Sequence, residues 1–381
     1  MEKFKIIIPC LFGLEALVAK ELKWLGYDVF KTEDGKVSFL GDFEAVARTN
    51  LWIRCGERVL IEVAEFDAIS FEELFEKTKA VKWSDWLPKD AVFPIKGFCL
   101  KSTLASMRDC QAIIKKAIAD SMSKSYGIDW FPETGTLYQI QFSVMKDKVS
   151  LMIDTSGDGL HKRGYRRIAN AAPLKETIAA AMVMLSFWKY EYPLLDPFCG
   201  SGTIPIEAAM FKRNIAPGIS RTFSSENFSQ IPQTIWNSAR SEAHDKMRDT
   251  LLNIVASDID TDILSVAMQN AKIAGVDDAI SFNSCDAAQV SSHEKYGSII
   301  CNPPYGERLG DKQSCEELYA NIGKAFSHLP DWSYYILASD ENFEKHFGKK
   351  ADKRRKIYNG MIKCNIYQYF GARPPKKTET T

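Results

Sequence analysis

Residues 298–306 read Ser-Ile-Ile-Cys-Asn-Pro-Pro-Tyr-Gly, an apolar run that ends at an amide, two prolines and an aromatic side chain. Such a run is typical of a buried parallel strand, and Pro303 and Pro304 cannot extend its hydrogen-bonded ladder. The chain therefore stops pairing at Asn302 and forms a rigid lip at the carboxyl end of a strand, where ligands bind in open α/β sheets. The Asn302 amide oxygen and nearby backbone carbonyls are acceptors, and Tyr305 offers a flat face. This set suits an exocyclic amine on a nucleobase, because accepting its N–H groups steers the nitrogen lone pair toward an electrophile.

Acidic residues stand at the ends of three further strand-like segments. Asp196 opens a turn that contains Gly200 and Gly202 and leads into a helix. Strand, Gly-rich turn and helix follow one another in dinucleotide-type sites, but an acid at the head of the turn repels phosphates and suits a cationic amine. Asp258 is placed to accept ribose hydroxyls, and Asp286 to accept an exocyclic amine such as that of adenine. An amine, a ribose and an adenine together make up S-adenosylmethionine.

Residues 302–305 resemble the Asn-Pro-Pro-Tyr motif of class I S-adenosylmethionine-dependent amino-methyltransferases, which act on DNA, RNA or protein amides. Taken singly, the motif can also be a strand-ending turn, and each acid a surface residue or helix cap. The resemblance implies a doubly wound sheet with an antiparallel last hairpin, turned at Asn359-Gly360. It implies catalytic roles for Asn302, Pro303, Pro304 and Tyr305, and cofactor contacts from Asp196, Pro197, Phe198, Gly200, Gly202, Lys175, Thr177, Asp258, Ile259, Asp286, Ala287 and Asn302.

The N-terminal part of the chain predicts two smaller α/β domains. Residues 1–64 follow the order βαββαβ of a ferredoxin-like domain, with a hairpin turn at Asp34-Gly35 and a helix capped by Asp42. Residues 65–160 form a second unit, with a helix capped by Ser70 and a long helix from 106 to 126. The methyltransferase domain is expected over 161–373, and a disordered tail over 374–381. An insertion of about forty residues before strand 254–258 is expected to cover the site.

Two basic clusters are candidates for phosphate contacts. The first follows a Gly-rich turn at the domain boundary, encloses Tyr165, and is similar to the junction between a THUMP domain and the catalytic domain of RNA methyltransferases. The second lies within residues 349–356, beside the carboxyl edge of the sheet. Either cluster is also consistent with a solvated surface. The residues expected to bind RNA are Lys162, Arg163, Arg166, Arg167, Arg354 and Arg355.

Nearly the whole chain resembles the THUMP-containing guanine-N2 RNA methyltransferases, and within them the bacterial 23S ribosomal RNA enzymes. The implied reaction is methylation of a guanosine N2 amine in RNA with S-adenosylmethionine as donor. A tRNA-modifying relative shares the layout. The sequence also leaves open a DNA adenine-N6 methyltransferase and a non-catalytic RNA-binding assembly factor. Cytosine C5 chemistry is not expected, because Pro-Cys occurs only at Pro9-Cys10 and Thr-Cys does not occur.

Composition narrows the remaining classes. The 49 basic residues balance the 49 acidic ones, so net charge favours no partner. The nine cysteines form no Cys-x-x-Cys pair and the five histidines are dispersed, which predicts reduced thiols and no metal site. No apolar run approaches the ~20 residues that span a bilayer, so a cytoplasmic protein without a membrane partner is expected.

Overall fold

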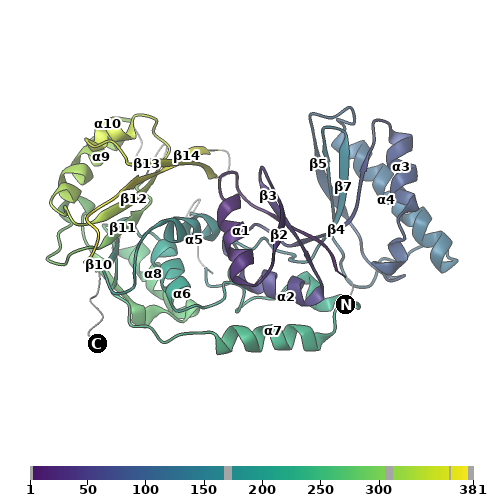
Figure 1. The fold of residues 1–381 in the computed structure, drawn as a ribbon, viewed down its shortest axis with the longest axis horizontal. Helices are drawn as coiled ribbons and strands as arrows, with labels where there is room; N and C mark the ends of the chain where they lie inside the picture. Colours follow the sequence, from purple (N-terminus) through teal and green to yellow (C-terminus); the bar gives the residue numbers. More distant parts are fainter. Residues whose placement is uncertain (1–2, 167–173, 305–311, 360–361, 376–381) are drawn as a thin grey trace. The chain divides into compact units, whose positions relative to one another are not determined.

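The computed structural model describes residues 3–166, 174–304, 312–359 and 362–375. The chain divides into two compact units, each built on a seven-stranded sheet (Figure 1). Unit 1 comprises Met1–Cys10, Val18–Leu160 and Arg221–Glu242, and unit 2 comprises Leu11–Leu17, His161–Ser220 and Ala243–Thr381.

The first half of unit 1 has the expected βαββαβ order. Its elements are β1 (Phe4–Pro9), α1 (Glu15–Trp24), β2 (Val29–Glu33), β3 (Lys36–Gly41), α2 (Phe43–Trp52) and β4 (Leu60–Asp67). The Asp42 side chain accepts the Ala45 N–H at 3.1 Å, so the predicted cap of α2 is confirmed. The last strand begins at Leu60, because Arg58 and Val59 bond Gly157 and Ser156.

The second half of unit 1 continues the same sheet. Its elements are α3 (Phe71–Ala80), β5 (Ile95–Leu100), α4 (Met107–Tyr126), β6 (Ile140–Met145) and β7 (Lys148–Asp154). Ser70 caps α3 as predicted, and Ser106 caps α4. The β6–β7 turn is made by Lys146 and Asp147, both with positive φ. Because β4 pairs with β7, the sheet runs β2-β3-β1-β4-β7-β6-β5 without interruption, and the two N-terminal halves share one sheet.

Residues 221–242 pack within unit 1, although they interrupt the sequence of unit 2. This segment, which we call the strap, contains most of α7 (Gln233–Asp245). Phe228 stacks on Tyr138 with ring centroids 4.1 Å apart and an interplanar angle of 15°. Glu242 pairs with Arg48 of α2 at 2.7 Å. These contacts lie within unit 1, and the expected role of the insertion as a cover for the site stays a prediction.

Unit 2 has a mixed sheet of order β10-β9-β8-β11-β12-β14-β13, in which only β14 runs antiparallel to its neighbours. The expected doubly wound sheet with an antiparallel last hairpin is confirmed. Its elements are α5 (Glu176–Leu185), β8 (Leu194–Asp196), α6 (Thr203–Lys212), β9 (Ile254–Asp258), α8 (Thr261–Ala274), β10 (Ile280–Ser284), β11 (Ser298–Cys301), α9 (Lys312–Ser327), β12 (Ser333–Ala338), α10 (Phe343–Phe347), β13 (Lys353–Asn359) and β14 (Ile362–Tyr369).

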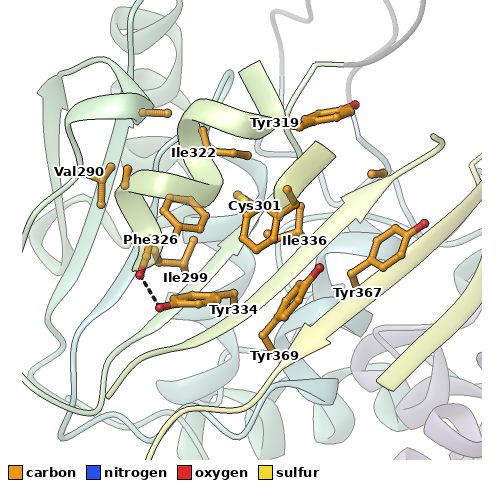
Figure 2. Close-up of a cluster of buried hydrophobic side chains, with 14 of the residues drawn as sticks. Val290, Ile299, Cys301, Tyr319, Ile322, Phe326, Tyr334, Ile336, Tyr367 and Tyr369 are labelled. Carbon is orange, nitrogen blue, oxygen red and sulfur yellow. Dashed lines mark hydrogen bonds between the residues drawn. The ribbon is translucent and has the colours of Figure 1, made fainter. Parts of the chain in front are cut away.

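Helices cover both faces of this sheet (Figure 1). On one face, Ile299 and Ile336 of the central strands pack against Ile322 and Phe326 of α9 (Figure 2). The Tyr334 hydroxyl donates to the Phe326 carbonyl at 2.6 Å, which satisfies the one polar atom of that ring in the core. Helices α5, α6 and α8 lie on the other face. A sheet buried on both sides fixes where each strand ends, and those ends position the site.

Candidate active site

A pocket of about 580 Å³ opens at the carboxyl ends of four neighbouring strands of unit 2. Asp196 ends β8, Asp258 ends β9, Asp286 follows β10 and Asn302 follows β11, and all four residues line this one pocket. The strands are adjacent in the order β10-β9-β8-β11 and run parallel, so their ends meet at one edge. The convergence predicted from the sequence is thus present.

Asp196, which lines the pocket, has an incompletely satisfied carboxylate. Its side chain is fully buried, and its Oδ1 accepts the Phe198 N–H at 3.1 Å. Its Oδ2 has no partner among the residues that the structure describes. Burial raises the pKa of Asp196 well above its ordinary value, and the nearby charge of Asp258 adds to this effect. A buried acid with one unsatisfied oxygen favours a cationic hydrogen-bond donor as its ligand.

Asn302 presents an acceptor in the same pocket. Its Oδ1 is buried and has no hydrogen-bond partner within the described ranges. Pro304 lines the pocket beside it, and its carbonyl accepts the Tyr319 hydroxyl at 3.4 Å. Pro303 is buried and does not line the pocket. Tyr305 lies outside the described residues.

The Gly-rich turn is held by Asp258. Its Oδ2 accepts the Gly200 N–H at 2.9 Å, and its Oδ1 accepts the Asp260 N–H at 3.1 Å. Gly202 caps α6 with a φ of 83°, a left-handed conformation that side chains rarely adopt. It shapes the turn without lining the pocket. Asp258 therefore joins two strand-end turns and also lines the pocket.

The other predicted cofactor residues divide into two groups. Pro197, Phe198, Gly200, Ile259 and Ala287 line the pocket. Lys175 and Thr177 do not: Lys175 precedes α5, and Thr177 is fully buried within it. Helix α5 is buried from Glu176 to Met184, so it has no free side for a ligand.

Several lining residues were not predicted. Ser201 and Thr203 belong to the Gly-rich turn and to the start of α6, where their proximity to Gly200 was a usable signal. Leu318 comes from α9, and no local pattern marks it. The unpredicted lining residues are Leu174, Cys199, Ser201, Thr203, Ile204, Asp260, Ile263, Cys285 and Leu318.

The basic junction is largely buried, which corrects part of the predicted RNA contact. Arg163 is 2% exposed, and its Nε lies 3.3 Å from Oε1 of Glu207. The Tyr165 hydroxyl donates to the same oxygen at 3.2 Å. Burial opposes the charge of Arg163, but the attraction of Glu207 and Glu176 outweighs it and raises the pKa of Arg163. Arg163 is thus an internal ion-pair residue, because reaching a phosphate would leave Glu207 buried without it.

Arg166 is also turned inward. Its Nη2 donates to the Leu174 carbonyl at 2.9 Å and to Thr203 Oγ1 at 2.8 Å, and lies 3.4 Å from Glu176 Oε1. Its side chain is 10% exposed. The prediction that Arg166 contacts RNA is therefore wrong in this fold. Lys162 is exposed and stays a candidate, and Arg167 lies outside the described residues.

The second basic cluster lies partly in an edge strand. Arg354 and Arg355 belong to β13 and stand opposite Tyr367 and Ile366 of β14, so the cluster follows the edge of the sheet and not its carboxyl ends. The Arg354 side chain is 52% exposed, whereas Arg355 donates to the Gly13 carbonyl at 2.7 Å. Arg354 is thus the more accessible of the two.

Within the described ranges, no three His, Cys, Asp or Glu side chains are grouped as metal ligands would be. In the same ranges, no helix combines the length and apolar character needed to cross a membrane.

Comparisons with known proteins match this architecture. Residues 163–368 match the family described as RMKL-like, methyltransferase domain, residues 5–60 an RlmL ferredoxin-like domain, and residues 68–154 a THUMP domain. YpsC of Bacillus subtilis (strain 168), a candidate RNA methyltransferase, is 47% identical over 100% of this chain and 99% of its own. The ribosomal RNA large subunit methyltransferase K/L of Psychromonas ingrahamii is 35% identical over 95% of this chain, which spans 49% of that protein.

Two solved structures extend the likeness. SMU.472, a candidate methyltransferase crystallised with S-adenosylhomocysteine, superposes with a TM-score of 0.92 at 40% identity and covers 98% of this chain and 100% of its own. A Listeria monocytogenes protein described as a predicted N6-adenine-specific DNA methylase gives a TM-score of 0.93 at 49% identity, and the superposition covers 98% of this chain and 97% of that protein. S-adenosylmethionine fits the pocket, because the unsatisfied Asp196 oxygen suits its ammonium group. The chain belongs to the THUMP-containing, RlmL-like class I methyltransferases, a family of RNA methyltransferases that use S-adenosylmethionine.

Proposed function

We propose that this protein methylates the exocyclic N2 amine of a guanosine in RNA, and that 23S ribosomal RNA is its substrate. The observation that carries the proposal is the buried Asn302 Oδ1, an acceptor without a partner among the described residues, in the pocket that Asp196 and Asp258 line. The name of the Psychromonas relative supports a large-subunit ribosomal substrate.

In this proposal the pocket residues hold the donor at one end and the target amine at the other. Asp196 accepts the ammonium group of S-adenosylmethionine, Asp258 its ribose hydroxyls, and Asp286 its adenine amine. When bound, S-adenosylmethionine supplies an electrophilic methyl group on a positively charged sulfur. The reaction needs little further activation from the protein, so alignment supplies most of the rate.

Asn302 and the adjoining backbone carbonyl accept the two N–H groups of the guanine amine. This orients the nitrogen lone pair at the methyl group. A base inside a helix must first be flipped out, at a cost of a few kcal/mol. Tyr305 is proposed to stack on the flipped base. Lys162 and Arg354, the accessible members of the two basic clusters, are proposed to hold the RNA backbone.

The test has two parts. RNA and DNA from a strain that lacks the gene are incubated separately with the protein and S-adenosylmethionine, digested and analysed by mass spectrometry, and N2-methylguanosine in 23S ribosomal RNA is expected. N6-methyladenosine in DNA, or N2-methylguanosine confined to tRNA, would replace the proposed substrate with that of a rival.

Asn302→Ala is expected to lower turnover by at least about 100-fold, the loss typical of removing one oriented hydrogen-bonding group at an active site. Its affinity for S-adenosylhomocysteine should stay within twofold of the wild-type value. Asn283→Ala, at an exposed position of β10, is the matched control. Wild-type turnover in Asn302→Ala would remove Asn302 from the mechanism.

A further inference from the structure

We infer that Arg166 is a positioning residue that fixes the Thr203 hydroxyl as a hydrogen-bond donor to the carboxylate of the bound cofactor's amino-acid end. The inference rests on S-adenosylmethionine as the methyl donor and on Asp196 as the partner of its ammonium group. It does not depend on which nucleotide is methylated.

The first step concerns the start of α6. Thr203 is the first residue of this helix and lines the pocket. The N-cap is Gly202, which has no side chain to bond the free N–H groups of the first turn. These N–H groups and the helix dipole favour an anion at that end.

The second step concerns the proton of Thr203. A hydroxyl group has one proton to donate and can accept two hydrogen bonds. Thr203 Oγ1 accepts from Arg166 Nη2 at 2.8 Å. Because the arginine always donates, the hydroxyl proton must point elsewhere, and it has no acceptor among the described residues. The Arg166 bond therefore leaves Thr203 as a donor beside the pocket, and the positive charge behind it strengthens that donor.

The third step concerns Arg166 itself. The same Nη2 donates to the carbonyl of Leu174, which also lines the pocket. Glu176 lies 3.4 Å away and compensates the charge in this nearly buried position. The Arg166 guanidinium is thus hydrogen-bonded to two lining residues, Leu174 before α5 and Thr203 at the start of α6. Lysine has a single nitrogen without this planar fork and would not hold the same geometry.

The fourth step is the pairing of charges across the pocket. Asp196 offers a fully buried, unsatisfied oxygen in the cavity that Thr203 also lines. A ligand with an ammonium and a carboxylate on one carbon can use both groups. S-adenosylmethionine and S-adenosylhomocysteine carry this end, whereas 5′-methylthioadenosine lacks it and keeps the adenine, ribose and sulfur.

This difference gives the experiment. Calorimetric affinities for S-adenosylhomocysteine and 5′-methylthioadenosine are measured on the full-length protein and its variants. Arg166→Met is expected to weaken S-adenosylhomocysteine binding at least tenfold. Its affinity for 5′-methylthioadenosine should stay within twofold of the wild-type value. Thr203→Val should give the same pattern. The affinity of the double variant for S-adenosylhomocysteine should lie within about twofold of that of Arg166→Met. Arg166→Lys should recover part of the loss.

Lys272→Met, at an exposed position of α8, is the control and should change neither affinity. If Arg166→Met does not fold, Arg166→Lys is compared in the wild-type and Thr203→Val backgrounds, because its effect on S-adenosylhomocysteine affinity should disappear when the Thr203 hydroxyl is absent. Equal losses for both ligands would show a general structural role, and an unchanged affinity for S-adenosylhomocysteine would show that Arg166 has no role at this end. Losses that add fully in the double variant would show that Arg166 does not act through Thr203. Each of these outcomes overturns the inference.

Discussion

Asp196→Asn tests the electrostatics of the cofactor site with the smallest change of shape. The substituted amide oxygen can still accept the Phe198 N–H, so the local turn is kept. What is lost is the negative charge at the fully buried Oδ2 position. The variant therefore separates the charge of Asp196 from its role in the backbone turn.

The expected cost to cofactor binding follows from the single charged contact that disappears. A hydrogen bond to a charged group contributes about 1.5–3 kcal/mol, which corresponds to a roughly 10- to 150-fold weaker affinity. The loss should appear for S-adenosylhomocysteine and not for 5′-methylthioadenosine, which has no ammonium group. Asp262→Asn, at an exposed position in the first turn of α8, is the matched control.

The same substitution should stabilise the cofactor-free protein. Burial raises the pKa of Asp196 in the folded state above its unfolded value. The folded state then holds its proton more tightly, so stability falls as pH rises from the unfolded pKa through the folded one. The substituted amide does not titrate and avoids this cost. The melting temperature of the variant should exceed that of the wild-type protein by an amount that grows from acidic to alkaline pH.

Calorimetry and melting curves check both halves of this prediction. Since a protein of two units need not unfold in one step, the transition to compare is the one that S-adenosylhomocysteine shifts in the wild-type protein. An Asp196→Asn variant that binds S-adenosylhomocysteine normally, or whose unliganded form is less stable than the wild-type protein at pH 8, would refute the reasoning.

Two further substitutions test the turn and the strap. Asp258→Ala should weaken S-adenosylhomocysteine binding by ~1.5–3 kcal/mol, because it removes the ribose acceptor and releases the Gly200 N–H; an unchanged calorimetric affinity would contradict this role. Phe228→Ala should destabilise unit 1 by ~3–5 kcal/mol, because Phe228 is buried against Tyr138, and should leave cofactor affinity unchanged. Phe30→Ala, at an exposed position, is its control. Normal stability with weakened cofactor binding in Phe228→Ala would contradict this prediction and would mean that the strap contributes to cofactor binding.

Local features of the fold could be predicted because they depend on neighbours in sequence. Asp42 and Ser70 cap helices as predicted, since each side chain bonds a backbone N–H three residues on. The predicted Asp34-Gly35 turn lies between β2 and β3, and Gly35 has the positive φ that such a turn requires. Such interactions need no knowledge of what packs on the element.

The site was partly predictable for a related reason. Apolar runs that end in Asp196, Asp258 and Asn302 predict parallel strands, and parallel strands in one sheet bring their carboxyl ends to one edge. The convergence of the acids and the amide thus follows from the pattern and the topology together. The pocket-lining Leu318 could not be found in this way. It is an apolar residue within α9, and nothing in the sequence around it distinguishes it from the other apolar residues of that helix.

The sequence by itself determined the order of elements, the strand-end acids and the amide at Asn302, because each depends on short-range pattern and chain direction. Only the tertiary structure decided what the basic junction pairs with and where the insertion packs. Arg163 and Arg166 look like phosphate contacts in the sequence, yet they face Glu207 and Glu176, which stand 44 and 10 residues later in the chain. A buried charge needs an oppositely charged partner to offset its desolvation cost. Which residues become partners depends on how separate segments of the chain pack together.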